Sequence, residues 1–310
     1  MKKTDQFMTK TIVVWLGALI CCALWGSAFP CIKLGYQWFQ IPSDAIGTQI
    51  LFAGWRFTLA GLLAIAIGSI LRRKLLLLQK ESVGKIVKLS MLQTVAQYIF
   101  FYIGLANTSG VKASIIEGVN VFIAIFVASL IFRQEALTAR KMVGSIIGFA
   151  GVVLVNVAGN GISMTFAWNG EGFIFLSTIA YAFSSVLLKR YSKEEDPVVL
   201  SGYQFVAGGV IMMLFGLLMG GRLTVFTEKG IAMLVYLALV SAVAYSLWGI
   251  LLKYNPISRV AVFGFMNPVF GVILSAILLD ESGSLGTTCV ISLVLVCVGI
   301  YIVNRQEKEK

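Results

Sequence analysis

The sequence contains no histidine and has few charged residues, prolines and cysteines. Charged residues make up 13% of the 310 residues and hydrophobic residues 58%, whereas an ordinary soluble domain has about 25% charged residues. With only five prolines and apolar residues throughout, the chain is neither collagen-like nor a disordered tail. So little charge cannot cover a water-soluble globule of this size, and the composition therefore places the chain in lipid.

The missing histidine narrows the chemistry. It excludes a Ser-His-Asp triad, a Cys-His nucleophile and histidine metal ligation. No two cysteines form a C-x-x-C pair, so neither a zinc site nor a redox dithiol is indicated. We therefore expect no cofactor and no metal, and we expect the cysteines to be small apolar filler within helices. They are Cys21, Cys22, Cys31, Cys289 and Cys297.

Long apolar runs dominate the chain. A transmembrane helix needs about 20 mostly apolar residues to cross a hydrocarbon core of about 30 Å, and ten runs meet that length. They cover approximately residues 12–35, 48–71, 85–105, 111–132, 141–158, 170–188, 198–220, 230–252, 257–279 and 286–303. No connection is long enough for a soluble domain. We predict an all-α polytopic membrane protein with ten transmembrane helices in one integral membrane domain.

The distribution of positive charge supports this count. With the N-terminus inside, most of the 25 Lys and Arg residues fall in segments on the cytoplasmic side. Lys112, Arg222 and Lys229 are the exceptions on the outer side. This positive-inside bias predicts a multi-pass protein of the inner (plasma) membrane with both termini in the cytoplasm. Contact with anionic lipid explains the net charge of +11 without a nucleic-acid partner.

The two halves of the chain are similar. Residues 24–33 align with residues 180–189, with an aromatic residue at the second position and Lys at the tenth position of both. Each unit has five helices, an odd number, so the second repeat (159–310) is expected to be inverted relative to the first (1–158). Two oppositely oriented bundles can expose a site between them to one side and then to the other.

Short motifs in the same order resemble the EamA-type branch of the drug/metabolite transporter superfamily. They are Trp25-Gly-Ser-Ala-Phe, Trp55-Arg-Phe and the stretch from Asn267-Pro-Val-Phe to Asp280-Glu281. The resemblance implies a ten-helix inverted-repeat carrier for metabolites in the bacterial inner membrane, often an exporter. It also implies a central cavity lined by helices one, three, four, six, eight and nine. The fourth run departs from the pattern, because it has Asn120-Val-Phe where the ninth has Asn267-Pro-Val-Phe.

Three ionisable side chains lie within apolar runs: Lys33, Arg56 and Glu117. Each costs about 2.5–3.5 kcal/mol on insertion scales, so its presence needs a reason. Arg56 and Glu117 both lie on the order of 10 Å below the outer surface, from the helical rise per residue. The three groups are candidates to bind a zwitterionic or anionic substrate, and a protonatable Glu117 is a candidate for proton coupling. The alternative is a structural ion pair, with Lys33 extending to the lipid headgroups.

Four amides lie near mid-depth. Gln93 and Gln97 share a face of the third run, and Asn120 lies one helical turn after Glu117. Asn267 occupies the corresponding place in the ninth run. An amide in hydrocarbon is costly without a partner, so these groups are expected to face one another, water or a ligand. The alternative is a set of hydrogen bonds that join helices.

Aromatic rings with a polar tip accompany these amides in runs one, three, six and eight. Such rings suit a cavity for an amphipathic solute, although ordinary helix packing is the alternative. The candidate substrate-binding residues are Trp25, Lys33, Arg56, Gln93, Gln97, Tyr98, Glu117, Asn120, Tyr181, Tyr245, Trp248 and Asn267.

These features together predict a secondary active transporter for a small organic metabolite, amino-acid-like or related. No G-x-x-x-x-G-K-[ST] motif is present, so nucleotide hydrolysis is not the expected driving force. An intramembrane enzyme acting on lipid and a channel are the alternatives. Gly144 and Gly148 form a G-x-x-x-G motif that suits close helix packing, so the chain is expected to be a monomer or a weak homodimer.

Overall fold

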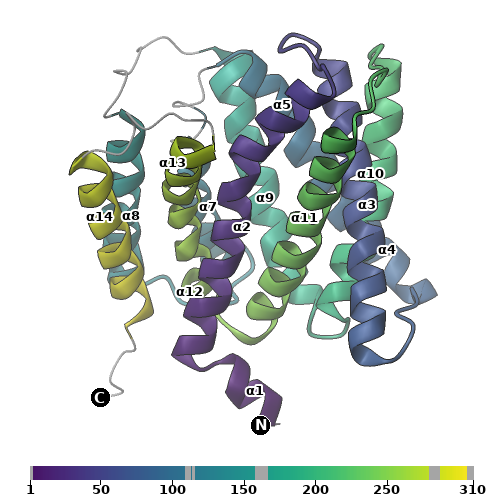
Figure 1. Cartoon of the computed structure of the whole chain (residues 1–310). Coiled ribbons are helices and arrows are strands. Elements are labelled where there is room, and N and C mark those ends of the chain that lie inside the picture. The colour runs from purple at the N-terminus through teal and green to yellow at the C-terminus, as the bar shows by residue number, and fades with distance from the viewer. Residues whose placement is uncertain (1–2, 109–112, 114–115, 158–166, 279–286, 306–310) are drawn as a thin grey trace.

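The computed structural model describes residues 3–108, 113, 116–157, 167–278 and 287–305. Within these residues every regular element is helical, and the helices stand side by side in one bundle (Figure 1). We call the end at which α2 begins and α14 ends the lower end, as drawn in Figure 1. The α-helices are α1 (Lys3–Met8), α2 (Thr11–Trp38), α3 (Ile46–Arg72), α4 (Val83–Leu89), α5 (Gln97–Ala106), α7 (Asn120–Phe126), α8 (Ala139–Val157), α9 (Phe173–Tyr191), α10 (Pro197–Leu218), α11 (Glu228–Tyr254), α12 (Ile257–Ala261), α13 (Met266–Leu278) and α14 (Thr287–Asn304).

Many of these helices are long and apolar. In the described part of the chain, six helical stretches have the length and composition to cross a membrane, and three shorter ones are also apolar. Large apolar side chains such as Leu62 and Leu214 remain more than half exposed within their helices, which suits contact with lipid. The all-helical membrane class is thus confirmed, whereas the count of ten spans stays a prediction.

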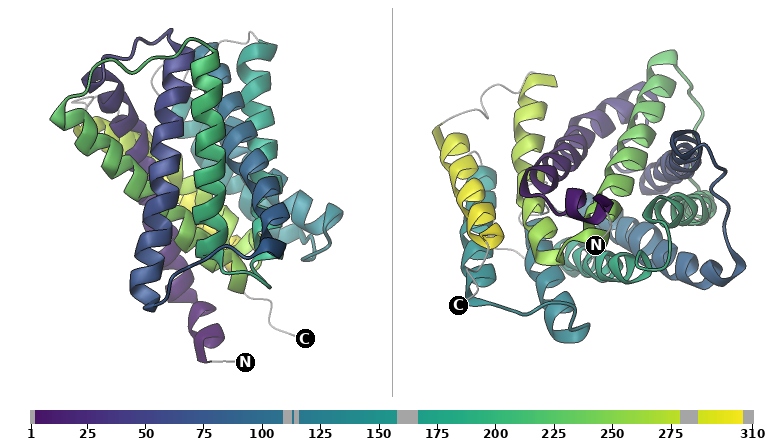
Figure 2. Two further views of the ribbon diagram at one scale, coloured as in Figure 1. Left: turned by 90° about the vertical axis from the view of Figure 1, so that its right-hand side faces the viewer. Right: turned by 90° about the horizontal axis from the view of Figure 1, so that it is seen from below.

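The helices pair across the two halves of the chain. The most extensive pairs are α3 with α10 and α8 with α14, and the latter pair stands at one side of the bundle when it is seen from below (Figure 2). α2 packs against both α11 and α13, while α9 packs against both α5 and α7. The central part of the bundle therefore contains helices from both halves.

Glycines allow the closest pairs to form. A Cβ added to Gly61 of α3 would lie 2.4 Å from the backbone oxygen of Gly202 in α10, so only glycine fits there. A Cβ on Gly299 of α14 would lie 2.5 Å from the backbone oxygen of Gly144 in α8, and one on Gly148 would collide with Phe265. The predicted G-x-x-x-G motif thus packs within the chain, since α14 covers the face of Gly144 that a homodimer would use.

The helices lose regular α geometry next to the predicted polar residues. A 3₁₀ segment, Val262–Phe265, precedes α13, which carries Asn267 in its first turn. A turn at Val119 precedes α7, which begins at Asn120, although only the ninth run has a proline at this place. A π-helical segment, Ser90–Ala96, interrupts the third run and contains Gln93. Such irregular turns are frequent at functional sites.

Lys112, Asp280 and Glu281, which the sequence singled out, lie outside the described residues.

Candidate functional site

A small cavity with polar and apolar walls lies among α7, α9, α11, α12 and α13. Its volume is about 20 Å³, which is room for about one water molecule. The lining residues are Asn120, Ala124, Tyr181, Ser185, Trp248, Leu252, Ile257, Ala261, Gly264 and Asn267. Four predicted residues, Asn120, Tyr181, Trp248 and Asn267, therefore meet at one place. In this conformation the cavity is smaller than an organic solute.

Two buried oxygen atoms around this cavity have no hydrogen-bond partner among the described residues. They are the Oδ1 atoms of Asn120 and Asn267. A buried polar atom without a partner costs about 1–3 kcal/mol, and nearly all such atoms in proteins are satisfied. The cavity therefore offers two hydrogen-bonding positions to water or to a solute. Ser185 was missed in the sequence, although it lies one helical turn after Tyr181 and so shares its face.

An aromatic cluster lies beside the cavity and shares Trp248 with it. The ring of Trp25 in α2 packs edge-on against Tyr245 at 5.1 Å and against Trp248 at 5.0 Å between centroids. The hydroxyl of Tyr98 in α5 lies 2.7 Å from the hydroxyl of Tyr245 in α11. The indole N–H of Trp25 has no acceptor among the described residues. Four predicted residues from three helices thus form one continuous group, with an unused donor in the middle.

Arg56 lies at the other end of this cluster. It is only 3% exposed, and its guanidinium carbon lies 5.0 Å from the ring centre of Phe57. Its Nε and Nη2 atoms both donate to the hydroxyl of Ser241 in α11, at 3.2 and 2.9 Å. The charge of Arg56 also interacts electrostatically with the phenol groups of four tyrosines from α2, α5 and α11. These are Tyr36, Tyr98, Tyr102 and Tyr245.

The other two ionisable candidates do not join Arg56. Between residues that the structure describes, no ion pair connects Glu117 to Lys33 or to Arg56. Lys33 lies on an exposed face of α2, and Glu117 is half-buried. The turn at Val119 separates Glu117 from Asn120, and Glu117 is not among the described residues that line the cavity. A regular helix would place Glu117 and Asn120 on one face, and the irregular turn changes that geometry.

The two glutamines are divided between different surroundings. Gln93 is buried in the π-helical segment, and Gln97 begins α5 beside Tyr245. The Oε1 atom of each has no hydrogen-bond partner within the described residues. Neither glutamine lines the cavity. Of the four amides expected in one layer, only Asn120 and Asn267 lie together.

The lower end of the bundle carries a polar network that sequence reasoning missed. We define the lower-end network as Arg72, Ser82, Lys85, Glu194, Glu195, Asp196 and Lys253. Its acidic residues form the turn between α9 and α10. Three successive acids beside a helix end were the only available signal in the sequence.

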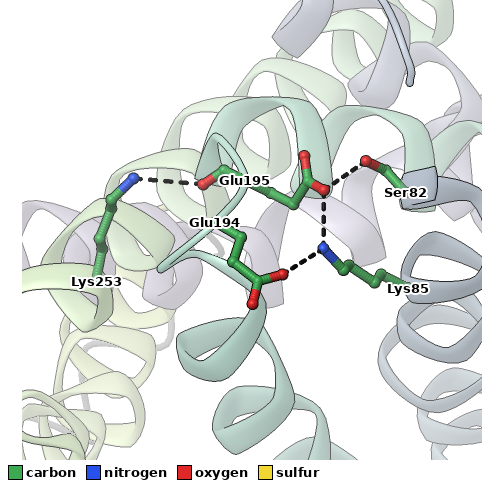
Figure 3. A network of polar contacts seen from close by, with 5 residues as sticks. All are labelled: Ser82, Lys85, Glu194, Glu195 and Lys253. Atoms are coloured by element: carbon green, nitrogen blue, oxygen red, sulfur yellow. Dashed lines mark hydrogen bonds and ion pairs between the residues drawn. The ribbon is translucent and has the colours of Figure 1, made fainter. Parts of the chain in front are cut away.

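Glu195 is the centre of this network (Figure 3). Its carboxylate accepts hydrogen bonds from Ser82 at 2.5 Å and from Lys85 at 2.9 Å, while Lys253 donates to its backbone oxygen at 3.3 Å. The hydrogen bond from Ser82, together with the hydrogen bond and charge of Lys85, holds the pKa of Glu195 below its ordinary value.

Further contacts at the lower end join the two halves of the chain. Arg72 at the end of α3 pairs with Asp196. Glu135 accepts hydrogen bonds from the backbone N–H and the hydroxyl of Ser258, at 3.0 and 2.9 Å. At the upper end the described residues form no ion pair with one another. The hydrogen bond that the Thr227 hydroxyl donates to the backbone oxygen of Trp38 at that end joins two uncharged groups. Ionic contacts between described residues are thus concentrated at one end.

The chain is similar to one family of transporters along most of its length. The sequence profile of the EamA-like transporter family matches residues 12–157 and again residues 168–305. An uncharacterized transporter of Archaeoglobus fulgidus is 28% identical, over 94% of this chain and 99% of its own length. The uncharacterized inner membrane transporter YedA of Escherichia coli is 27% identical, over 90% of this chain and 89% of its own length. A crystal structure with 18% identity superposes with a TM-score of 0.76, over 94% of this chain and 96% of the other, which establishes a shared fold.

Proposed function

Because the chain belongs to the EamA-like transporter family, we propose that it is a secondary active carrier working by alternating access. It moves a small organic metabolite, amino-acid-like or related, across a bacterial inner membrane, and export is the expected direction. The family and the names of its relatives indicate a membrane transporter, and the proposal includes no enzymatic activity. The carrier acts as a monomer or weak homodimer.

The proposal includes ten spans in two inverted repeats, residues 1–158 and 159–310. It is supported by the helix pairs, because an inverted repeat pairs each contact with a counterpart. The contact of α2 with α11 corresponds to that of α9 with α5, and the contact of α2 with α13 corresponds to that of α9 with α7. The pairs α3–α10 and α8–α14 are their own counterparts. The family profile also matches once in each half.

The observation that carries the proposal is the cavity with two unpartnered asparagine oxygens. Asn120 and Asn267 come from corresponding helices of the two halves and line the same small space. A site between two such halves is exposed to either side when the halves move against each other. The small volume fits a conformation in which the helices have closed around the site.

We assign the lower end to the cytoplasmic side, with both termini there. One support is that α2 begins and α14 ends at the same end of the bundle (Figure 1). The other is that Lys and Arg residues are concentrated in the segments assigned to that side. The lower-end network then forms the barrier between the cavity and the cytoplasm.

Proton coupling is assigned to Glu117. Its carboxylate is half-buried and forms no hydrogen bond or ion pair with another described residue. Glu117→Gln is expected to abolish the pH dependence of transport while leaving the protein folded. If the variant retains the pH dependence of the parent, Glu117 does not couple transport to protons.

The carrier function is tested by counterflow in proteoliposomes. Pools of metabolites are first screened for thermal stabilisation of the purified protein, because a ligand of the folded state raises its apparent stability. Each stabilising compound is then loaded inside the vesicles, and uptake of the same labelled compound is measured. A carrier gives transient accumulation of label above equilibrium. Flux that does not saturate and is not accelerated by solute on the opposite side would indicate a channel instead.

The cavity is tested with Asn120→Leu and Asn267→Leu. Either change removes a hydrogen-bonding group from the site, and we expect exchange to fall by about tenfold or more. Asn304→Leu is the matched control, because Asn304 also has a buried, unpartnered Oδ1 atom but lies in α14, away from the cavity. Equal losses in all three variants would remove the cavity from the proposal.

A further inference from the structure

Arg56 is a buried positive charge without a negative partner in the described part of the chain. Its side chain is 3% exposed, and no described Asp or Glu oxygen lies within the 4.0 Å that defines an ion pair. The Ser241 hydroxyl accepts two of the five N–H groups that a guanidinium offers, and the Tyr102 hydroxyl is a further, neutral hydrogen-bond partner. A hydroxyl satisfies hydrogen bonds but does not neutralise charge, and an uncompensated buried charge is strongly unfavourable.

The side of Arg56 that faces Ser241 is suited to an anion. Nε and Nη2 form the edge with which arginine binds a carboxylate through two parallel hydrogen bonds. In this conformation one oxygen, Oγ of Ser241, accepts from both. Ser241 therefore occupies the place that a carboxylate would take.

The surroundings of this edge are aromatic. Phe57 packs under the guanidinium, Tyr98 lies 4.4 Å from Phe57 between ring centres, and Tyr245 stands 4.8 Å from Phe205. Beyond Tyr245, the Trp25 ring leads toward Trp248 and the cavity. The cluster thus provides one cation and several aromatic rings, and it reaches the cavity through Trp248.

We infer that Arg56 binds the negatively charged group of the substrate, and that the substrate is an organic monocarboxylate with an apolar or ring-containing body. The inference rests on the proposed carrier function. A single guanidinium balances one negative charge, which favours a carboxylate over a doubly charged phosphate monoester. The aromatic side chains accept the apolar body by offset or edge contacts.

The test uses matched small probes and the purified full-length protein. Thermal stabilisation is measured with benzoate, phenylacetate and cyclohexanecarboxylate, with their three neutral amides, and with benzylamine and phenyl phosphate. The parent protein should be stabilised by one or more of the carboxylates and at least tenfold less effectively by the corresponding amide. Benzylamine and phenyl phosphate should have no comparable effect.

Two variants separate a binding role from a structural one. Arg56→Gln removes the charge and should weaken carboxylate binding at least tenfold, while the melting temperature of the ligand-free protein stays the same or rises because a buried charge is gone. Ser241→Ala removes the competing hydroxyl and should bind carboxylates at least as tightly as the parent. A ligand-free Arg56→Gln protein that melts lower, with unchanged carboxylate binding, would show that Arg56 is structural and overturn the inference.

The remaining outcomes are distinct from a failure of the carrier function. Stabilisation and counterflow with amides or benzylamine, but not with carboxylates, would retain the carrier and overturn the anion site. Carboxylate binding that depends on Arg56, without counterflow, would retain the anion site and overturn the carrier. If none of the three carboxylates stabilises the protein at millimolar concentration, the inference is also overturned.

Discussion

Removing the charge of Glu195 should open the lower end of the bundle. In Glu195→Gln the side chain keeps its size and an oxygen that can accept from Ser82, but it loses the ion pair with Lys85. The lower-end network joins the turn between α9 and α10 to α4 through these contacts. When the network is weakened, conformations that expose the cavity to the lower side become more populated.

The size of the effect follows from the burial of the two neighbouring acids. The Glu195 side chain is 12% exposed and accepts two hydrogen bonds, whereas Glu194 is 75% exposed and accepts one, from the same Lys85. Hydrogen bonds to charged groups are worth about 1.5–3 kcal/mol when protected, and exposed ion pairs about 0–1 kcal/mol. Since Gln retains part of the hydrogen bonding, we expect Glu195→Gln to destabilise the closed lower end, relative to the open one, by about 1–2 kcal/mol. Glu194→Gln, the matched control, should cost less than about 0.5 kcal/mol.

Access to the cavity can be measured with a cysteine at Ala261, which lines it. The rate at which a membrane-impermeant maleimide labels Ala261→Cys from the lower side reports the open population. About 1.4 kcal/mol is a tenfold change in an equilibrium, so labelling should accelerate roughly five- to thirtyfold with Glu195→Gln and about twofold at most with Glu194→Gln. Equal labelling rates in the two variants would refute the reasoning that Glu195 holds this end closed.

Three further predictions concern stability and packing. The folded-state pKa of Glu195 is lowered from its ordinary 4.5, so the carboxylate stabilises the fold fully above about pH 4.5, and this contribution is lost as the pH falls through the lowered pKa. Melting curves between pH 3 and 7 should show this loss of stability in the parent protein and a smaller loss in Glu195→Gln. Gly61→Ala should destabilise the protein by about 1–3 kcal/mol, because the added methyl group meets the backbone of α10. The control Gly84→Ala, where nothing lies within 4 Å of the added Cβ, should be neutral or stabilising by up to about 1 kcal/mol. Equal melting temperatures of the two variants would refute the close approach of α3 and α10. Tyr98→Phe should lower the melting temperature by the equivalent of about 1 kcal/mol, because it removes the bond to Tyr245, and an unchanged value would show that water replaces this bond.

Part of the candidate site could be predicted from residue type and depth. Asn120, Asn267, Tyr181 and Trp248 were expected to face a cavity because a polar group in lipid needs a partner, and the structure brings all four to one space. The same reasoning failed to separate the cavity from its surroundings, since Gln93 is equally polar and buried but lies elsewhere.

Partners distant in the sequence could not be predicted. Arg56 was recognised as a buried charge, but Ser241, its hydrogen-bond acceptor, is 185 positions away. Ser82 and Glu195 are separated by 113 positions, and neither lies in an apolar run where a polar residue would be conspicuous. Glu117 and Asn120 were expected on one face, and only the structure reveals the turn between them.

The sequence by itself determined that the chain is a helical membrane protein of two similar halves. These properties depend on the length, apolarity and order of segments, because the bilayer selects for them residue by residue along the chain. Only the tertiary structure decided which helix faces meet, because lipid is as apolar as a packed core and an apolar helix does not reveal which side faces its neighbours. The cavity, the place of Arg56 among aromatic rings and the ionic contacts at the lower end all depend on that choice of faces.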